Sequence, residues 1–329
     1  MRQLLNRHLG ACVIGLIGVV GLGAPAAHAT SFSNAYYFGD SLSDTGNVFA
    51  LTGGAVPAAP YFGGRFSDGP VWVETLAAGI GLPGSATASL LGGNNYAFGG
   101  ARTSGGSIPS LLAQVGGFTG AAGPVDPAAL YVVVGGGNDM RDARSAFPTM
   151  DAAGAAGRAA AAQAAADNLA TTLQLLAADG AQHVLIGNLP DLGTTPEALA
   201  LGLAPASSDA SFQFNTRLTD VVSFGQSLGL TMYFLDLAGI SNAVRADALG
   251  NGGAVYGITN VFTPCGSFTG SVGVPCAVSA FSDALHPSAR AHEILGQAAV
   301  SVVPEPATWL LMALGTAGLL ARRRVAQAA

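Results

Sequence analysis

The chain has 329 residues, of which 50% are hydrophobic and 10% are charged, and its formal net charge is −6. Five of its 13 basic residues lie in the two terminal segments, so residues 30–303 hold 8 arginines against 18 acidic side chains. A surface this acidic excludes the basic patches on which nucleic-acid binding depends. The length between the two ends suits one large domain with a complete hydrophobic core.

The first residues have the form of an export signal. Two arginines precede an uncharged apolar run over residues 9–22, and Ala27-His28-Ala29 has the A-x-A pattern of a cleavage site. The sequence therefore predicts a signal peptide over residues 1–29 and an exported protein. An N-terminal membrane anchor that is never cleaved is the alternative interpretation.

Apolar runs typical of strands alternate with helical patterns along the middle of the chain. The predicted strands cover residues 35–38, 130–134, 183–186 and 231–235. The predicted helices cover residues 155–178, 208–228 and 288–302. This alternation indicates a parallel sheet covered by helices on both faces, which is the doubly wound α/β class. Folds of this class bind their ligands at the carboxyl ends of the strands.

Three long segments, residues 51–70, 84–123 and 250–282, interrupt the alternation and are rich in small residues. Loops of this length in a compact domain are usually functional or mobile. The last of them contains Cys265 and Cys276, flanked by glycine and proline. In an oxidising compartment two cysteines this close are expected to form a disulfide. A metal site is disfavoured, because no further ligand lies nearby.

Ser41 and His286 are candidates for chemistry. Ser41 follows the first strand in the string GDSLS, which is not a G-x-S-x-G elbow, and a serine there could simply cap a helix. His286 stands three residues after Asp283 at a loop-to-helix junction, where the carboxylate could accept the second N–H of the imidazole. We expect His183, at the start of a strand, to be structural and His292, inside the last helix, to lie on the surface.

Two glycine-rich strings could supply donors to an oxyanion. Residues 95–101 read NYAFGGA, where the missing side chains of glycine allow a close backbone approach. Residues 135–139 read GGGND and follow directly on the strand at residues 130–134. Asn138 is therefore expected at the carboxyl end of that strand, where its amide could donate to an oxyanion. Each string taken alone is also compatible with a simple glycine turn.

The strings GDS, NYAFGGA, GGND and DALH follow one another in this order and resemble the four signature blocks of the GDSL family of serine hydrolases, also called SGNH hydrolases. Residues 64–72, GRFSDGPVW, resemble the segment after the first block in the lipase-like branch. The resemblance spans nearly the whole mature chain. It implies a three-layer α/β/α sandwich of flavodoxin-like topology and no metal or organic cofactor.

The resemblance also implies roles for individual residues. The predicted catalytic residues are the nucleophile Ser41, the base His286 and its orienting carboxylate Asp283. The predicted oxyanion hole consists of the N–H groups of Ser41 and Gly100 and the side chain of Asn138. The adjacent Gly99 could take the place of Gly100 if the register slips by one residue. Asp44 and Asn47 match the first block as well and are expected only to hold the turn.

The C-terminal segment carries a second signal. Pro304-Glu305-Pro306 precedes an uncharged run over residues 307–321 and three arginines at 322–324. The run is shorter than the roughly 20 residues of a comfortable membrane span. This order resembles the PEP-CTERM sorting signal of Gram-negative bacteria. It implies that the tail, residues 303–329, holds the protein at the inner membrane until a sorting protease acts on it; a permanent anchor is the alternative.

The sequence thus predicts an exported serine ester hydrolase with a domain over residues 30–302, and a final position outside the cell or on its surface. The lipase-like segment favours a small-molecule or lipid ester as substrate. The sorting tail suggests a polysaccharide-rich outer layer, so an O-acetyl esterase acting on acetylated polysaccharide is the second hypothesis. A surface-attached binding protein without activity is the third.

Overall fold

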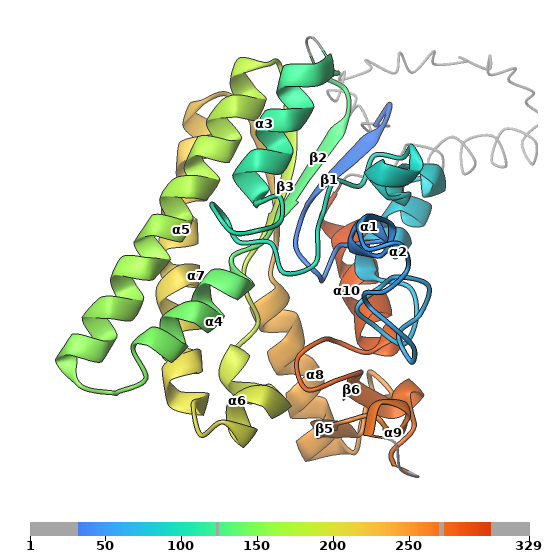
Figure 1. The fold of residues 1–329 in the computed structure, drawn as a ribbon, viewed down its shortest axis with the longest axis vertical. Helices are drawn as coiled ribbons and strands as arrows, with labels where there is room; N and C mark the ends of the chain where they lie inside the picture. The colour runs from blue at the N-terminus through green and yellow to red at the C-terminus, as the bar shows by residue number, and fades with distance from the viewer. Residues whose placement is uncertain (1–31, 123–124, 270–272, 304–329) are drawn as a thin grey trace, which may run out of the picture.

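The computed structural model describes residues 32–122, 125–269 and 273–303 (Figure 1). The predicted signal peptide lies outside these residues, as does the predicted sorting tail after Val303. Across the described ranges, no helix combines the length and the apolar character needed to cross a bilayer.

The centre of the fold is a parallel sheet with the strand order β1-β2-β3-β4. Its strands are β1 (Ala35–Gly39), β2 (Leu130–Val134), β3 (His183–Gly187) and β4 (Thr231–Leu235). The five residues of β2 are all apolar or aromatic and all buried, as a strand covered on both faces requires. The four strands predicted from the sequence are therefore confirmed.

A further segment extends the sheet beyond β1. Tyr37 donates its N–H to Asn94 O (3.1 Å) and accepts from the N–H of Tyr96 (2.7 Å), and Phe98 donates to Gly39 O (3.1 Å). This segment runs parallel to β1 on the side opposite β2. In space the order is this segment, β1, β2, β3 and β4, which is the flavodoxin-like order 2-1-3-4-5.

Helices cover both faces of the sheet (Figure 1). One face packs on α3 (Leu111–Ala122), α4 (Gly137–Ala146), α5 (Ala152–Ala178) and α7 (Ala204–Ser227). The other face packs on α2 (Trp72–Gly79) and α10 (Ala289–Val302). Neighbouring residues of β1 serve opposite faces: Phe38 belongs to the first core and Tyr37 to the second. The structure is thus the three-layer α/β/α sandwich that the resemblance implies.

Further helices and a second sheet complete the domain. The α-helices are α1 (Asn47–Leu51), α6 (Pro196–Ala200), α8 (Leu237–Asn251) and α9 (Gly266–Thr269). The 3₁₀ helices are η1 (Pro83–Ala86), η2 (Ser89–Leu91), η3 (Leu192–Thr194) and η4 (Cys276–Val278). A second sheet pairs β5 (Asn260–Pro264) with β6 (Ser279–Phe281) in parallel, and a disulfide joins Cys265 to Cys276 beside it.

Two expectations from the sequence need correction. Residues 111–122 form a helix, although they contain three glycines and were expected to be part of a loop. Packing against α5 and β1 outweighs the low helix propensity of glycine. His292 is fully buried and does not lie on the surface. Its Nδ1 accepts the N–H of Trp72 (3.3 Å), because α10 packs this side of the helix closely against α2.

Candidate active site

Ser41 lies in the turn that follows β1. The main-chain oxygen of Asp40 accepts the N–H groups of Ser43 and Asp44, both at 3.0 Å, and its Oδ1 accepts that of Leu42 (3.0 Å). Gly39 is required at the end of the strand, because a Cβ there would lie 2.4 Å from Val134 O on β2. Burial raises the pKa of Asp40 to about 6. The turn therefore holds Ser41 at the carboxyl edge of the sheet.

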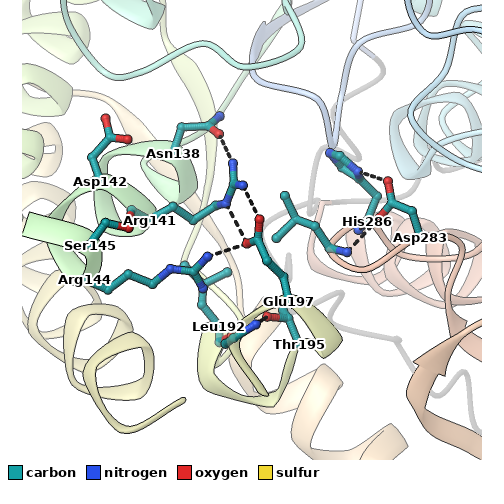
Figure 2. Close-up of polar contacts among 12 residues, drawn as sticks. Asn138, Arg141, Asp142, Arg144, Ser145, Leu192, Thr195, Glu197, Asp283 and His286 are labelled. Carbon is teal, nitrogen blue, oxygen red and sulfur yellow. Dashed lines mark hydrogen bonds and ion pairs between the residues drawn. The ribbon is translucent and has the colours of Figure 1, made fainter. Parts of the chain in front are cut away.

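His286 contacts Ser41 from a distant part of the chain. Its Nε2 lies 2.9 Å from Ser41 Oγ and its Nδ1 lies 2.6 Å from Asp283 Oδ2. The other oxygen of Asp283 accepts the N–H groups of Leu285 (2.7 Å) and His286 (2.6 Å), so the DALH turn folds around this carboxylate (Figure 2). The three residues singled out from the sequence thus form one continuous hydrogen-bonded chain.

Tyr61 is a neighbour of this chain that the sequence did not reveal. Its hydroxyl donates to Asp283 Oδ2, the same oxygen that faces His286. Burial alone would raise the pKa of Asp283, but the hydrogen bonds from His286 and Tyr61 hold it below its ordinary value. The Phe66 ring lies 5.4 Å from the His286 ring. Tyr61 and Phe66 both belong to the long loop predicted over residues 51–70. Phe66 also lies in the string GRFSDGPVW, whereas the length of the loop was the only sequence signal near Tyr61.

The structure distinguishes the two glycines proposed for the oxyanion hole. The N–H of Gly99 donates to Asp44 Oδ2 (2.8 Å). Among the residues that the structure describes, the N–H groups of Gly100 and Ser41 have no hydrogen-bond acceptor. Gly100 has φ +80°, a conformation that favours glycine. Its N–H, together with that of Ser41, is therefore available to a ligand, whereas the N–H of Gly99 is occupied.

Three buried polar side chains join the Ser41 turn to the segment that contains Gly100. Asp44 bonds to the N–H of Gly99, as described above. The Nδ2 of Asn47 donates to the main-chain oxygens of Asn95 (2.7 Å) and Ala97 (2.8 Å). The Nδ2 of Asn95 donates back to Ser43 O (2.6 Å). Asp44, Asn47 and Asn95 are all inaccessible to solvent, so this side of the site is held from within.

Asn138 lies near the start of α4, and charged residues hold it. Its Nδ2 donates one hydrogen bond to Ala101 O (2.9 Å), which leaves a second N–H of the amide. Its Oδ1 accepts from Arg141 (3.2 Å), and Arg141 in turn pairs with Glu197 (Nε to Oε2, 3.0 Å) (Figure 2). This chain of contacts fixes the orientation of the Asn138 amide.

Glu197 connects this side of the site to the DALH turn. Its carboxylate pairs with Arg141 and with the buried Arg144, and its own N–H donates to Ala284 O (2.7 Å). Burial would raise the pKa of Glu197, but the two arginines hold it below its ordinary value. Glu197 is the second residue of the single-turn helix α6, which the hydroxyl of Thr195 caps by accepting from the N–H of Ala198 (3.2 Å). Nothing in the sequence marked Glu197 or Arg141 as part of the site.

Two cavities meet at Ser41. The first, which we call the α8 cavity, runs between α8 and α10 and is mainly apolar; its aliphatic lining includes Leu42, Leu237, Ile240, Val244, Ile294 and Leu295. The second, the entrance cavity, is lined by Val48, Val56, Tyr61, Phe66 and Gly100. Ser41, Asn138, Arg141, Leu285 and His286 line both. An ester placed at Ser41 can therefore extend into a separate cavity on either side.

The described part of the chain contains no cluster of side chains that could form a metal centre. In the described ranges, no group of three or more histidine, cysteine, aspartate or glutamate side chains is arranged to hold a metal ion. The polar groups around Ser41 are instead one imidazole, one guanidinium, an amide, carboxylates and free N–H groups. Such a set suits attack by a hydroxyl on a carbonyl carbon and stabilisation of the resulting negative oxygen.

Known proteins resemble this chain over different lengths. The phosphatidylcholine-sterol acyltransferase of Aeromonas hydrophila is 30% identical over 225 residues, which are 67% of this chain and 63% of that protein. The esterase EstA of Pseudomonas aeruginosa is 28% identical over 353 residues, 93% of this chain and 51% of that protein. The chain thus spans about half to two thirds of the length of these relatives.

A carbohydrate acetylesterase from Sinorhizobium meliloti is similar in structure, with a TM-score of 0.44 and 15% identity over 82% of this chain and 96% of that one.

Two family models match the chain. The PEP-CTERM protein-sorting motif matches residues 302–324, the region of the predicted sorting tail. The model described as GDSL-like Lipase/Acylhydrolase matches residues 36–299, which run from within β1 to within α10 and include every residue of the candidate site. Because this match covers well over half of its length, the chain belongs to the GDSL-like lipase/acylhydrolase family.

Proposed function

We propose that the protein is an exported serine hydrolase that cleaves carboxylic esters. The observation that carries the proposal is the chain of contacts from Ser41 Oγ through His286 to Asp283, at 2.9 Å and 2.6 Å. A serine hydroxyl is a weak nucleophile until a neighbouring base removes its proton, and this arrangement supplies the base. Membership of the lipase/acylhydrolase family supports the same reaction class.

The reaction would proceed in two steps. Ser41 Oγ attacks the ester carbonyl while His286 Nε2 takes its proton, and His286 then returns that proton to the departing alcohol. Asp283 holds the Nδ1–H of the imidazole and stabilises its charged form. A water molecule, activated by His286 in the same way, then attacks the acyl group on Ser41 and releases the carboxylic acid.

The negative oxygen that develops in both steps needs donors. We assign this role to the N–H groups of Ser41 and Gly100 and to the free N–H of the Asn138 amide. The first two have no acceptor within the described chain, and Arg141 orients the third. Preorganised donors of this kind are usually the largest single contribution to catalysis of acyl transfer.

The α8 cavity favours substrates with a longer aliphatic acyl group over acetate esters. An acetyl group would contact little of the aliphatic lining of this cavity. A longer acyl chain would displace water from the cavity and would gain binding free energy for each methylene that it buries. We therefore infer an esterase or lipase specificity. An acyl-chain-length series, measured beside an acetylated polysaccharide, tests this choice: a preference for the polysaccharide would favour the O-acetyl esterase hypothesis.

Ser41→Ala is the direct test of the mechanism. It should lower turnover of p-nitrophenyl butyrate by at least about 10³-fold, because the nucleophile is lost. It should also abolish labelling by a fluorophosphonate. Ser241→Ala is the matched control, because Ser241 lines the α8 cavity and belongs to no such chain of contacts. Wild-type turnover by the Ser41→Ala protein would refute the proposal, and an unlabelled wild-type protein would favour the inactive binding protein.

The ends of the chain suggest how the enzyme reaches its place of action. We propose that residues 1–29 direct export and are removed, and that the tail holds the protein at the inner membrane until a sorting protease acts. The matched sorting motif supports this order of events. Intact-mass analysis of the protein recovered from membrane and medium would detect both cleavages; a tail still present on all secreted protein would contradict the second.

A further inference from the structure

Two stretches of chain beside the candidate site lack charge. Residues 45–64 and 75–101 contain no Asp, Glu, Lys or Arg, although the mature domain as a whole is strongly acidic. Between them the only charged residues are Arg65, Asp68 and Glu74. Arg65 pairs with Glu74 (2.7 Å), and Asp68 accepts hydrogen bonds from two groups close to the start of α10. Asp68 is therefore the only charge in residues 45–101 that has no partner of opposite sign among the described residues.

The same stretches expose large apolar side chains. Those that are between 36% and 65% exposed are Phe49, Leu51, Val56, Phe62, Leu90 and Leu91. They come from α1, the loop after it and η2. The N–H of Leu90 donates to Asn47 Oδ1 (3.0 Å), so η2 lies against α1. A Cβ placed on Gly54 would be 3.4 Å from the Phe49 ring, so the loop lies against α1 as well. We call these six residues the apolar face.

The apolar face continues into the entrance cavity. Val56 belongs to both, and Val48, on the same helix as Phe49 and Leu51, also lines the cavity. Ser41 and His286 line the same cavity. A molecule that contacts the apolar face thus has a continuous apolar path to Ser41.

We propose that the apolar face docks the protein on a lipid surface, from which the site takes lipid esters. Exposed apolar patches of this kind mark sites of association with membranes or proteins. Hydrocarbon is the complement of a face that carries large apolar side chains and no charge, and a lipid ester held there lies next to Ser41. Association with a second copy is disfavoured, because two acidic domains repel each other. The inference rests on the proposed ester hydrolysis.

The test compares two double variants of the full chain. Leu51→Ser with Leu91→Ser removes the most exposed leucines of the apolar face, at 56% and 65%. Phe212→Ser with Leu249→Ser is the matched control, because these side chains are 66% and 56% exposed on α7 and α8, outside the face. Each protein is assayed for flotation with phosphatidylcholine vesicles, for hydrolysis of a short-chain phosphatidylcholine below and above its critical micelle concentration, and for hydrolysis of soluble p-nitrophenyl acetate.

We expect vesicle partitioning of the Leu51→Ser/Leu91→Ser protein to fall by about tenfold or more, because two leucines no longer enter the lipid. The ratio of its phosphatidylcholine hydrolysis rate above the critical micelle concentration to the rate below it should fall by about the same factor. The control protein should keep both values. All proteins should hydrolyse the soluble ester within about twofold of wild type, since exposed substitutions rarely disturb the fold.

An equal loss of vesicle partitioning in the two double variants, or no loss in either, would overturn the docking inference and would leave the proposed ester hydrolysis intact. A wild-type dimer that only Leu51→Ser/Leu91→Ser dissociates would overturn it too, because the face would then join two copies. Absence of soluble esterase activity in the wild type would instead refute the proposed function.

Discussion

The two sides of the candidate oxyanion hole are held by different kinds of interaction. On the Gly100 side, Asp44, Asn47 and Asn95 are fully buried, and they bond mainly to main-chain groups. On the Asn138 side, Arg141 and Glu197 form an ion pair whose side chains are 31% and 22% exposed. Salt screens partly exposed pairs and leaves buried hydrogen bonds nearly unaffected. The first side is thus part of the folded core, and the second is an adjustable electrostatic support.

This difference predicts how each side fails. Removal of a buried acceptor leaves main-chain donors without partners, so the fold and the site should be lost together. Weakening of the ion pair should disturb the orientation of Asn138 while most of the domain stays folded. Three substitutions, taken from the largest expected effect to the smallest, separate these outcomes.

Asp44→Asn should have the largest effect. The two oxygens of Asp44 accept four main-chain N–H groups, those of Gly46, Asn47, Val48 and Gly99. The asparagine amide would turn a donor toward two of them, at a cost of about 1–3 kcal/mol for each unpaired buried donor. Because the Gly99–Gly100 segment loses its support, kcat should fall by about 10²-fold, as when one oxyanion donor is lost. Urea denaturation and steady-state kinetics measure the two effects.

Asp167→Asn is the control for this prediction. Asp167 is exposed on α5, and among the described residues its carboxylate accepts only from Gln163, so the change in unfolding free energy should stay within about 0.5 kcal/mol. If Asp44→Asn preserved both stability and kcat, the buried carboxylate would not support the oxyanion hole.

Glu197→Gln should have an intermediate effect that falls mainly on kcat. The glutamine keeps one acceptor oxygen but loses the charge that pairs with Arg141 and with the buried Arg144. The Asn138 amide, which Arg141 holds, therefore becomes less well oriented. We expect kcat to fall by about tenfold, a fraction of the 10²–10³ that a whole oxyanion donor contributes, while KM stays nearly constant. In the Asn138→Ala background the same substitution should lower kcat no further, because the group that Glu197 positions is already absent.

Asp142→Asn is the control for loss of an ion pair, because Asp142 lies on α4, the helix that carries Arg141. Asp142 pairs with Arg102 at the surface, where the side chains are 55% and 40% exposed, and such pairs contribute little. Additive effects of Glu197→Gln and Asn138→Ala would show that Glu197 acts on the reaction by some other route, or only on stability.

The sequence identified the residues that stand within short strings and missed those that act across the chain. Ser41, Asn138, Asp283 and His286 each lie in a string of characteristic order. The structure places Ser41, Asn138 and His286 at both cavities and Asp283 at the entrance cavity. Glu197 reaches Arg141 over 56 residues and Tyr61 reaches Asp283 over 222, and neither lies in a pattern. Contacts of this kind depend on tertiary packing, which a local string does not record.

Prediction of the fold from the sequence was limited by tertiary packing as well. The continuous apolar strands were readable, because burial on both faces leaves an unbroken run in the sequence. Helix α3 was hidden by its glycines, since only its packing against α5 and β1 selects the helical state. His292 was misplaced because the side of α10 on which it lies is decided by the neighbouring helix α2, and a histidine by itself does not indicate that side.

Tyr61→Phe should have the smallest effect, and it acts on pH dependence. The substitution keeps the ring but removes the hydroxyl that donates to Asp283 Oδ2. The Tyr61 hydroxyl helps to hold the pKa of Asp283 below its ordinary value. The stability that this hydrogen bond contributes is therefore present above the unfolded pKa of about 3.9 and is lost as the pH falls below that value. Wild type should therefore exceed Tyr61→Phe in unfolding free energy by about 1 kcal/mol at pH 7. The difference should shrink toward pH 3.

The same substitution should move the acidic limb of the kcat/KM profile. Without the tyrosine hydroxyl, the Asp283 carboxylate becomes a stronger acceptor for the Nδ1–H of His286, so the limb should move to higher pH by a few tenths of a unit. Tyr233→Phe is the control, because Tyr233 is also half-buried but its hydroxyl faces His183 (3.4 Å), outside the site. A stability loss with no shift of the limb would mean that Tyr61 supports only the loop, and that the ion-pair side remains the one adjustable part of the site.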